Sequence, residues 1–159
     1  MTSSTDPEFA SLAEARASLT GLEYFRRMMA GKLPAPPMLT LLGLRMVEAE
    51  EGRVVFLAEP SEAYDNGTGI AHGGFLATLL DSALGCAINA QMPAGRQFRT
   101  LELTINYTRP VTSAAGTLRC EAHVIHVGSR VATSEARVTD ARGRLYAHAT
   151  TTCIAVEPR

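Results

Sequence analysis

The stretch Asn66 to Ala90, NGTGIAHGGFLATLLDSALGCAINA, decides the fold that this sequence predicts. It begins as a glycine-rich loop and continues as the most strongly helical segment of the chain. At 100° per residue, one side of this helix is apolar over roughly 140°. The apolar positions are Phe75, Leu76, Leu79, Leu80, Ala83, Cys86 and Ala87. The pattern predicts a long helix that is buried along this side.

The opposite side of the helix carries small residues and one acid. Its positions are Gly74, Thr78, Asp81 and Gly85, with Ala77 and Ile88 beside them. Small side chains let another backbone approach closely, so we expect this side to be covered as well. A lone carboxylate on a covered face is costly unless it is hydrogen-bonded or functional. Asp81 is therefore either a local cap or pair, or a group that takes part in chemistry, and we favour the second.

The composition is that of one globular domain. The chain has 159 residues, of which 46% are hydrophobic and 19% charged, enough for a moderate core. A net charge of −1 gives no indication of nucleic acid or an anionic membrane as a partner. Three widely spaced cysteines predict reduced thiols. The polar N-terminus and the lack of an 18-residue apolar run predict a cytoplasmic protein without a membrane span.

Around the central helix, the sequence predicts an α+β arrangement. Residues 11–31 are predicted as one helix that Gly31 ends, and three prolines then form a stiff linker. Strands are predicted at 45–50, 53–58, 98–107, 117–127, 130–140 and 145–156. A hydrophobic helix followed by a meander of long strands predicts a curved antiparallel sheet wrapped around that helix. Residues 1–37 are assigned to an N-terminal helical extension, and residues 38–159 to the main domain.

The strand predicted at 98–107 has the clearest alternation of apolar and polar residues. One face is expected to carry Leu101, Leu103, Ile105 and Tyr107, and the other Thr100, Glu102, Thr104 and Asn106. The predicted strands are too few for a closed barrel. A second copy of the chain is therefore the expected cover for the small side of the helix.

The segment His72-Gly73-Gly74 marks the start of the helix. Amides at a helix start lack intrahelical partners and carry the positive end of the macrodipole. Glycines let a ligand approach these amides, which suits a carbonyl oxygen that becomes an oxyanion. The alternative is that the glycine pair only turns loop into helix.

Gly73 and Asp81 are too far apart to serve one small carbonyl from the same helix. Eight residues at 1.5 Å each separate them by ~12 Å. If two copies of the chain pack their small faces antiparallel, however, Gly73 of one copy can meet Asp81 of the other. The spacing then predicts one composite site across a dimer interface.

Together with the strand that follows, this segment resembles a known family. Asn66-x5-His72-Gly73-Gly74-x6-Asp81, followed by the run TLELTINYTRP from Thr100 to Pro110, resembles the hotdog-fold acyl-CoA thioesterases, in particular the phenylacetyl-CoA-type (PaaI-like) branch. The resemblance covers roughly residues 40–156. It implies a hotdog fold, hydrolysis of acyl-CoA by water, and a homodimer that doubles into a homotetramer. No cofactor is implied apart from the coenzyme A of the substrate.

The resemblance also implies roles for individual residues. Asp81 corresponds to the catalytic carboxylate, acting as general base or nucleophile, and Gly73 to the oxyanion amide of the neighbouring subunit. Asn66 and His72 correspond to loop residues that orient the thioester or support the loop, and Thr100 to a hydroxyl that helps to place the water. Contacts to the substrate and its coenzyme A are expected from Gly74, Tyr107, Arg109, Gly128, Ser129 and Arg130.

Other chemistries fit these residues less well. Ser82 lies 100° round the helix from Asp81 and no GxSxG elbow exists, so a serine triad is not expected. His72 is interpreted as a hydrogen-bonding loop residue, with general base as its alternative. The remaining histidines and the cysteines lack metal-ligand spacing.

A non-catalytic acyl-CoA-binding module stays open as the alternative function, although a binding pocket has no need of a buried base. Phe75, Leu79, Met46 or the N-terminal helix are candidate pocket walls.

Overall fold

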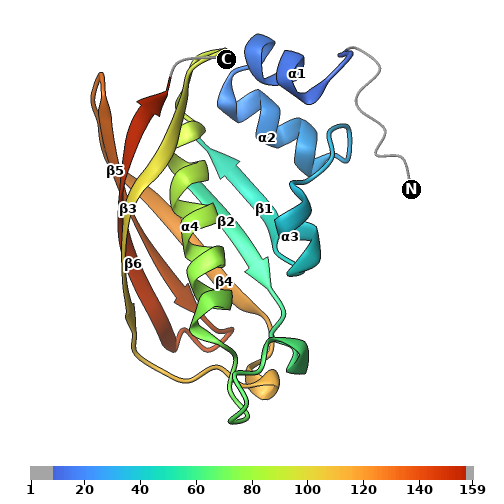
Figure 1. Ribbon diagram of the computed structural model, residues 1–159, viewed down its shortest axis with the longest axis vertical. Helices are drawn as coiled ribbons and strands as arrows, with labels where there is room; N and C mark the ends of the chain where they lie inside the picture. Colours follow the sequence, from blue (N-terminus) through green and yellow to red (C-terminus); the bar gives the residue numbers. More distant parts are fainter. Residues whose placement is uncertain (1–8, 157–159) are drawn as a thin grey trace.

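The computed structural model describes residues 9–156 of the chain. Helix α4 (Gly73–Asn89) lies at its centre, across one face of a curved antiparallel sheet (Figure 1). Within these residues the sheet has six strands in the order β1-β2-β4-β5-β6-β3. The strands are β1 (Arg45–Glu50), β2 (Arg53–Ala58), β3 (Gln97–Tyr107), β4 (Leu118–Val127), β5 (Val131–Thr139) and β6 (Leu145–Val156). The predicted α+β architecture, a long helix wrapped by a curved sheet, is confirmed.

The apolar side of α4 packs against β2, β3, β4, β5 and β6. Phe75, Leu76, Leu79, Leu80, Ala83 and Ala87 are buried there, as the periodicity predicts. Leu84 and Ile88 are buried too, whereas Cys86 is only half-buried. The buried stripe is wider than predicted because the curved sheet surrounds more than one side of the helix.

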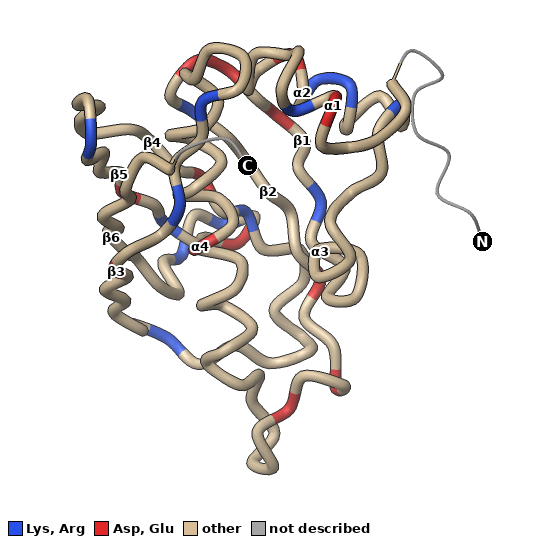
Figure 2. The backbone as a smooth tube through the Cα atoms, turned by 45° about the horizontal axis from the view of Figure 1, so that its top comes forward, with Lys and Arg blue, Asp and Glu red and all other residues tan. Residues whose placement is uncertain are grey.

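The small side of α4 is only partly covered in the single chain. Ala77, Thr78, Asp81, Ser82 and Gly85 all keep part of their surface accessible. Asp81 is the only Asp, Glu, Lys or Arg of the helix, and most of its course is accordingly uncharged in Figure 2. Residues 9–156 of one chain thus leave open the side for which the sequence predicts a cover.

Strand β3 is not part of the meander that the sequence predicts. The meander consists of β4, β5 and β6, and β3 pairs with β6 at the far edge of the sheet. The connection from β3 to β4 passes the start of α4, where the Ala71 N–H donates to the Val111 C=O at 2.7 Å. Val111 is buried, so this anchor carries the chain past the helix start to the other half of the sheet.

A β-bulge in β3 overturns part of the predicted alternation. Thr100 pairs with Cys153 and Glu102 with Thr152, so Leu101 is an extra residue without a partner. Leu101 is 63% exposed, whereas Leu103 packs against the core. The bulge shifts the alternation by one residue, so Thr100 lies on the helix side instead of the outer side. This shift places its hydroxyl beside α4.

The predicted helix over residues 11–31 is wrong, because the chain forms two helices there. They are α1 (Leu12–Ser18) and α2 (Gly21–Met29), separated by an extended Leu19. Thr20 and Glu23 form a capping box, in which each side chain accepts a hydrogen bond from the other residue's N–H. The box starts a new helix at a point where helical periodicity alone predicts a continuous one.

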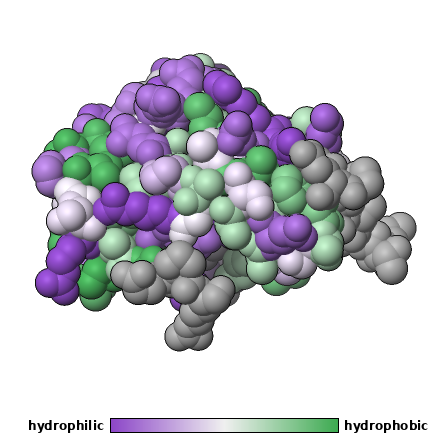
Figure 3. Space-filling view, turned by 90° about the horizontal axis from the view of Figure 1, so that it is seen from above, coloured by the Kyte–Doolittle hydropathy of each residue, from purple (hydrophilic) through white to green (hydrophobic). Residues whose placement is uncertain are grey.

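Helix α2 begins directly against the end of α4. The Gly21 N–H donates to the Met92 C=O at 3.0 Å, and a Cβ at Gly21 would lie 1.7 Å from the Asn89 carbonyl oxygen. Only glycine fits this approach. Helix α2 then packs against β1, and α3 (Pro37–Leu41) follows it. Seen from the end of the molecule where α1 and α2 lie, the surface mixes hydrophobic and hydrophilic residues (Figure 3). The boundary predicted between residues 37 and 38 stays a prediction.

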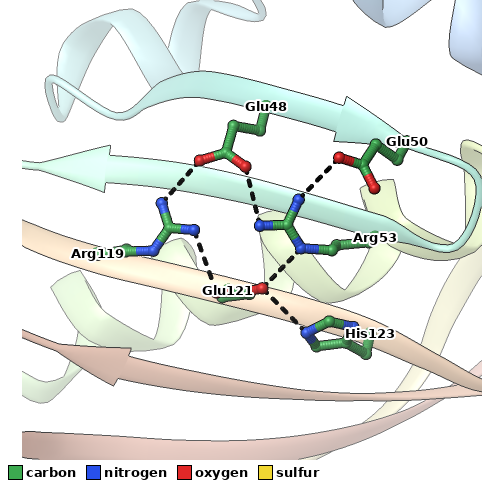
Figure 4. Close-up of polar contacts among 6 residues, drawn as sticks. All are labelled: Glu48, Glu50, Arg53, Arg119, Glu121 and His123. Atoms are coloured by element: carbon green, nitrogen blue, oxygen red, sulfur yellow. Dashed lines mark hydrogen bonds and ion pairs between the residues drawn. The ribbon is translucent and has the colours of Figure 1, made fainter. Parts of the chain in front are cut away.

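The outer face of β1, β2 and β4 carries a charged cluster, drawn in Figure 4. Arg53 donates to Glu121 at 2.6 Å and to Glu48 at 2.8 Å, and these hydrogen bonds raise the pKa of Arg53. Arg119 also bridges Glu48 and Glu121. Val55 pairs with both Glu48 and Glu121 and is fully buried. The cluster therefore covers the one valine of β2 that faces away from α4.

Candidate active site

Asp81 borders a pocket of about 500 Å³ on the small side of α4. Its walls come from α4, from β3 and from the segment around α3. The lining residues are Pro36, Met38, Leu39, Ala77, Thr78, Asp81, Ser82, Cys86 and Leu103. Asp81 is half-buried and is the only charged residue among them. The pocket therefore presents one carboxylate to a mostly apolar space, and its size is typical of small-molecule sites.

The walls differ from those that the sequence predicts. Phe75 and Leu79 are buried in the core, and Met46 lies elsewhere, under α3. No sequence pattern marks Pro36, Met38 and Leu39 as lining residues. Pro37 at the first position of α3 is the signal that could have indicated a helix there, because proline is favoured at that position.

Asp81 receives a hydrogen bond from Thr100. The Thr100 hydroxyl donates to Asp81 Oδ1 at 2.7 Å. This contact depends on the bulge at Leu101, which places Thr100 on the helix side of β3. Among residues 9–156, Asp81 forms no ion pair with Lys, Arg or His. The carboxylate is held by one neutral donor and keeps its remaining acceptor capacity for the pocket.

Two other side chains of the pocket are candidate nucleophiles. Burial of the sulfur raises the pKa of the Cys86 thiol to about 12, so the reactive thiolate is scarce at neutral pH. Ser82 has no hydrogen bond to a histidine within the described part of the chain, so it lacks the base that a serine nucleophile requires. Asp81 is the group of this pocket best suited to proton transfer or nucleophilic attack.

The loop before α4 is ordered by its own polar groups. Asn66 Oδ1 accepts from the Thr68 N–H at 3.0 Å and from the Thr68 hydroxyl at 2.6 Å. The His72 N–H donates to the Tyr64 C=O at 2.7 Å. His72 is the N-cap of α4, and its Nδ1 accepts from the Gly74 N–H at 2.9 Å. Asn66 and His72 thus shape the loop and the helix start.

The Gly73 amide is left available by this capping. His72 occupies the Gly74 N–H, whereas the Gly73 N–H donates no hydrogen bond within residues 9–156. The Tyr107 hydroxyl donates to the Gly73 C=O at 3.0 Å and so braces the first turn. An unpaired amide at the positive end of a 17-residue helix is suited to an anionic oxygen.

The remaining predicted contact residues do not meet in one chain. Through the shared partner β6, Val131 is level with Arg99, and Val138 is level with Tyr107. The turn Gly128-Ser129-Arg130 therefore lies at one end of the sheet, and Tyr107 and Arg109 lie at the other. The Arg96 guanidinium donates to the Ser129 C=O at 2.6 Å, and the Arg109 guanidinium lies 5.8 Å from the Tyr146 ring centroid. Gly73 and Asp81 are likewise separated along α4.

The part of the chain that the structure describes has neither a metal-binding group of side chains nor a membrane-spanning helix. Between residues 9 and 156, His, Cys, Asp and Glu form no group of three or more that could hold a metal ion. In the same part of the chain, every helix is too short or too polar to cross a membrane.

Comparison with known proteins identifies the family. The family model of the thioesterase superfamily matches residues 68–147. A Halobacterium salinarum protein described as a candidate esterase is 34% identical over 106 residues, which cover 64% of this chain and 68% of that protein.

Solved structures agree with this match. A candidate thioesterase of Ralstonia eutropha, related to phenylacetic acid degradation, has a TM-score of 0.75 at 28% identity, covering 82% of this chain and 98% of that one. A Streptococcus mutans protein bound to acetyl-CoA has a TM-score of 0.64 at 29% identity, covering 73% of this chain and 90% of that one. The helix wrapped by its sheet is the hotdog fold, and the chain belongs to the thioesterase superfamily.

Proposed function

We propose that this protein hydrolyses acyl-CoA thioesters to a free acid and coenzyme A. The observation that carries the proposal is Asp81, a half-buried carboxylate with one neutral donor beside a pocket of about 500 Å³. Membership of the thioesterase superfamily supports thioester hydrolysis. The acetyl-CoA bound by the Streptococcus mutans protein supports coenzyme A as the thiol of the substrate.

In the proposed reaction Asp81 activates water. The carboxylate takes a proton as the water oxygen attacks the thioester carbonyl carbon, which becomes tetrahedral and carries an oxyanion. The C–S bond then breaks, the carbonyl re-forms, and the thiolate of coenzyme A leaves. A thiolate is a good leaving group and needs little help from an acid. Direct attack by Asp81, followed by hydrolysis of the anhydride, is the alternative role of the same carboxylate.

The proposed oxyanion donor is Gly73 of the partner subunit. Because Gly73 lies ~12 Å from Asp81 on the same helix, the amide reaches the reacting carbonyl only from a second copy. Antiparallel packing of two small α4 faces would bring the two groups together. It would also bring the Tyr107 and Arg109 end of one copy toward the turn Gly128-Ser129-Arg130 of the other. We therefore propose a homodimer as the active unit, with a homotetramer as its expected assembly.

The proposal is tested by thiol release from a panel of acyl-CoA thioesters with the native protein and with Asp81→Asn. We expect kcat to fall by about 10²–10⁴ in Asp81→Asn, because the base is removed while the side-chain shape is kept. The melting temperature and the dissociation constant for coenzyme A should stay near the native values. A native protein that binds acyl-CoA without releasing thiol would instead be a binding module, and an active Asp81→Asn protein would rule out this mechanism.

A further inference from the structure

A second pocket adjoins the pocket that contains Asp81. Its volume is about 470 Å³, and it is lined by residues of α2, the linker that follows, α3 and the start of β1. Its lining residues are Met28, Met29, Ala35, Leu39, Thr40, Gly43, Leu44, Arg45 and Met46. Three methionines and two leucines make most of this lining flexible and apolar, which suits an alkyl chain.

Leu39 is the one described residue that lines both pockets. Its side chain is only 6% exposed and belongs to the hydrophobic core. Its backbone is held as well, because the Leu39 N–H donates to the Pro36 C=O at 3.0 Å and the Leu39 C=O accepts from the Leu44 N–H at 2.8 Å. Leu39 is therefore held in place where the two pockets meet, and we treat its side chain as the wall between them.

We propose that Leu39 sets the maximal length of the acyl group. This inference rests on the proposed thioester hydrolysis, in which the acyl group occupies the pocket beside Asp81. A short or compact acyl group ends at the Leu39 side chain. The distal carbons of a longer chain need the second pocket, which the isobutyl group of Leu39 closes off.

Leu39→Ala removes most of the wall and should extend the range of accepted substrates. The kcat/KM of Leu39→Ala relative to the native protein should rise about fourfold for each methylene that enters the second pocket. Short acyl groups should lose little. Leu39→Val removes less of the wall, so it should give a smaller shift in the same direction, and it serves if Leu39→Ala does not fold. Leu41→Ala is the matched control, since Leu41 lies on the same helix, is 74% exposed and lines neither pocket.

A second substitution tests the route of the chain. Ala35 lines only the second pocket, so Ala35→Leu fills part of it. By itself, Ala35→Leu should leave the chain-length profile of the native protein unchanged, because the wall is intact. Combined with Leu39→Ala, it should shorten the accepted chain again. A merely structural effect of Leu39→Ala would not be reversed in this way.

Two readouts separate this inference from the proposed function. Thiol release is measured with saturated acyl-CoA thioesters of two to sixteen carbons, and affinity for the same chain lengths is measured with free fatty acids. If the native protein releases no thiol, the proposed function fails, and a longer affinity profile in Leu39→Ala still supports the wall. If folded Leu39→Ala and Leu39→Val both keep the native profile in both readouts, the inference is overturned. Failure of every chain length to bind would overturn it as well.

Discussion

The surroundings of Asp81 fit a reactive group better than a structural one. A structural carboxylate is usually satisfied by several donors, as Asp140 shows in this protein: it accepts from the Arg142 and Arg144 N–H groups, from the Arg144 guanidinium and from the Tyr146 hydroxyl. Within residues 9–156, Asp81 has one donor, Thr100, and otherwise borders the pocket. The two acids thus differ in the number of their hydrogen-bond donors. Of the two, only Asp81 keeps acceptor capacity for a water molecule.

Thr100 is expected to position the Asp81 carboxylate. Thr100→Val keeps the shape but removes the donor, and hydrogen bonds to charged groups contribute about 1.5–3 kcal/mol. We therefore expect kcat to fall about ten- to hundredfold with KM little changed. Thr100→Ser should restore most of the rate. Thr150→Val, an exposed β6 position on the outer face, is the control. Equal losses in Thr100→Val and Thr100→Ser would show that the hydroxyl is not the cause.

The Gly73 amide can be tested with a matched pair of variants. Proline is tolerated at the first position of a helix, and the ψ of His72, 137°, lies in the range that a residue before proline adopts. Gly73→Pro removes the amide hydrogen and should lower kcat by about 10²–10³. Gly73→Ala keeps the hydrogen and adds a Cβ that would lie 3.3 Å from the Tyr107 ring. If both variants lose the same activity, the contact with Tyr107 is responsible and the amide is not.

At the scale of elements, α4 could be predicted and β3 only in part. The 3.6-residue periodicity predicts α4 along its whole length, because one continuous sheet covers its apolar side. In β3, the run of alternating residues from Phe98 to Tyr107 conceals the extra Leu101, since a bulge needs no glycine or proline to mark it. The family resemblance therefore assigns Thr100 to the predicted site, whereas strict alternation assigns it to the face opposite Leu103, which is wrong.

The pocket wall shows a second limit of sequence reasoning. Pro36 to Leu39 lie at the end of the proline linker, and no local pattern indicates which part of the molecule a stiff linker crosses. Only the structure shows that α3 and the small side of α4 line the same pocket. Similarly, α1 and α2 are separate helices because Thr20 and Glu23 form a capping box. Its sequence signal lies inside a run with helical periodicity and is therefore easily overlooked.

The turn between β5 and β6 should weaken in acid because of Asp140. Burial opposes the charged form, but the hydrogen bonds from Arg144 and Arg142 prevail and lower the pKa of Asp140 from 3.8 to about 2. As the pH falls, the unfolded chain therefore takes up this proton at a higher pH than the folded chain does. The stabilisation is complete above pH 3.8 and is lost as the pH drops toward 2. Asp140→Asn should melt earlier than the native protein at pH 6, and the difference should shrink toward pH 2.5. A gap that is constant with pH would contradict this role.

At the scale of the whole molecule, the open side of α4 predicts self-association. Gly85 lies one turn beyond Asp81, and a Cβ built there meets nothing within 4 Å in the single chain. Gly85→Lys should therefore leave the isolated fold intact, and replacing glycine favours the helix by about 0.5–1 kcal/mol. In a packed dimer face, however, a buried lysine is costly. We expect the native protein to sediment as a dimer or tetramer at micromolar concentration, and Gly85→Lys as an inactive monomer. A native monomer with full activity would exclude the shared site.

The pocket beside Asp81 is built from two stretches of chain that lie far apart in the sequence. Its reactive wall belongs to α4 and β3, inside the segment that the family model matches, and its opposite wall belongs to Pro36, Met38 and Leu39, upstream of that segment. Under the proposed function the two walls have separate tasks: the α4–β3 wall cleaves the bond, and the wall from Pro36 to Leu39 limits the acyl group. Substitutions in residues 28–46 would then change which substrates are accepted, while the residues proposed to cleave the bond stay as they are.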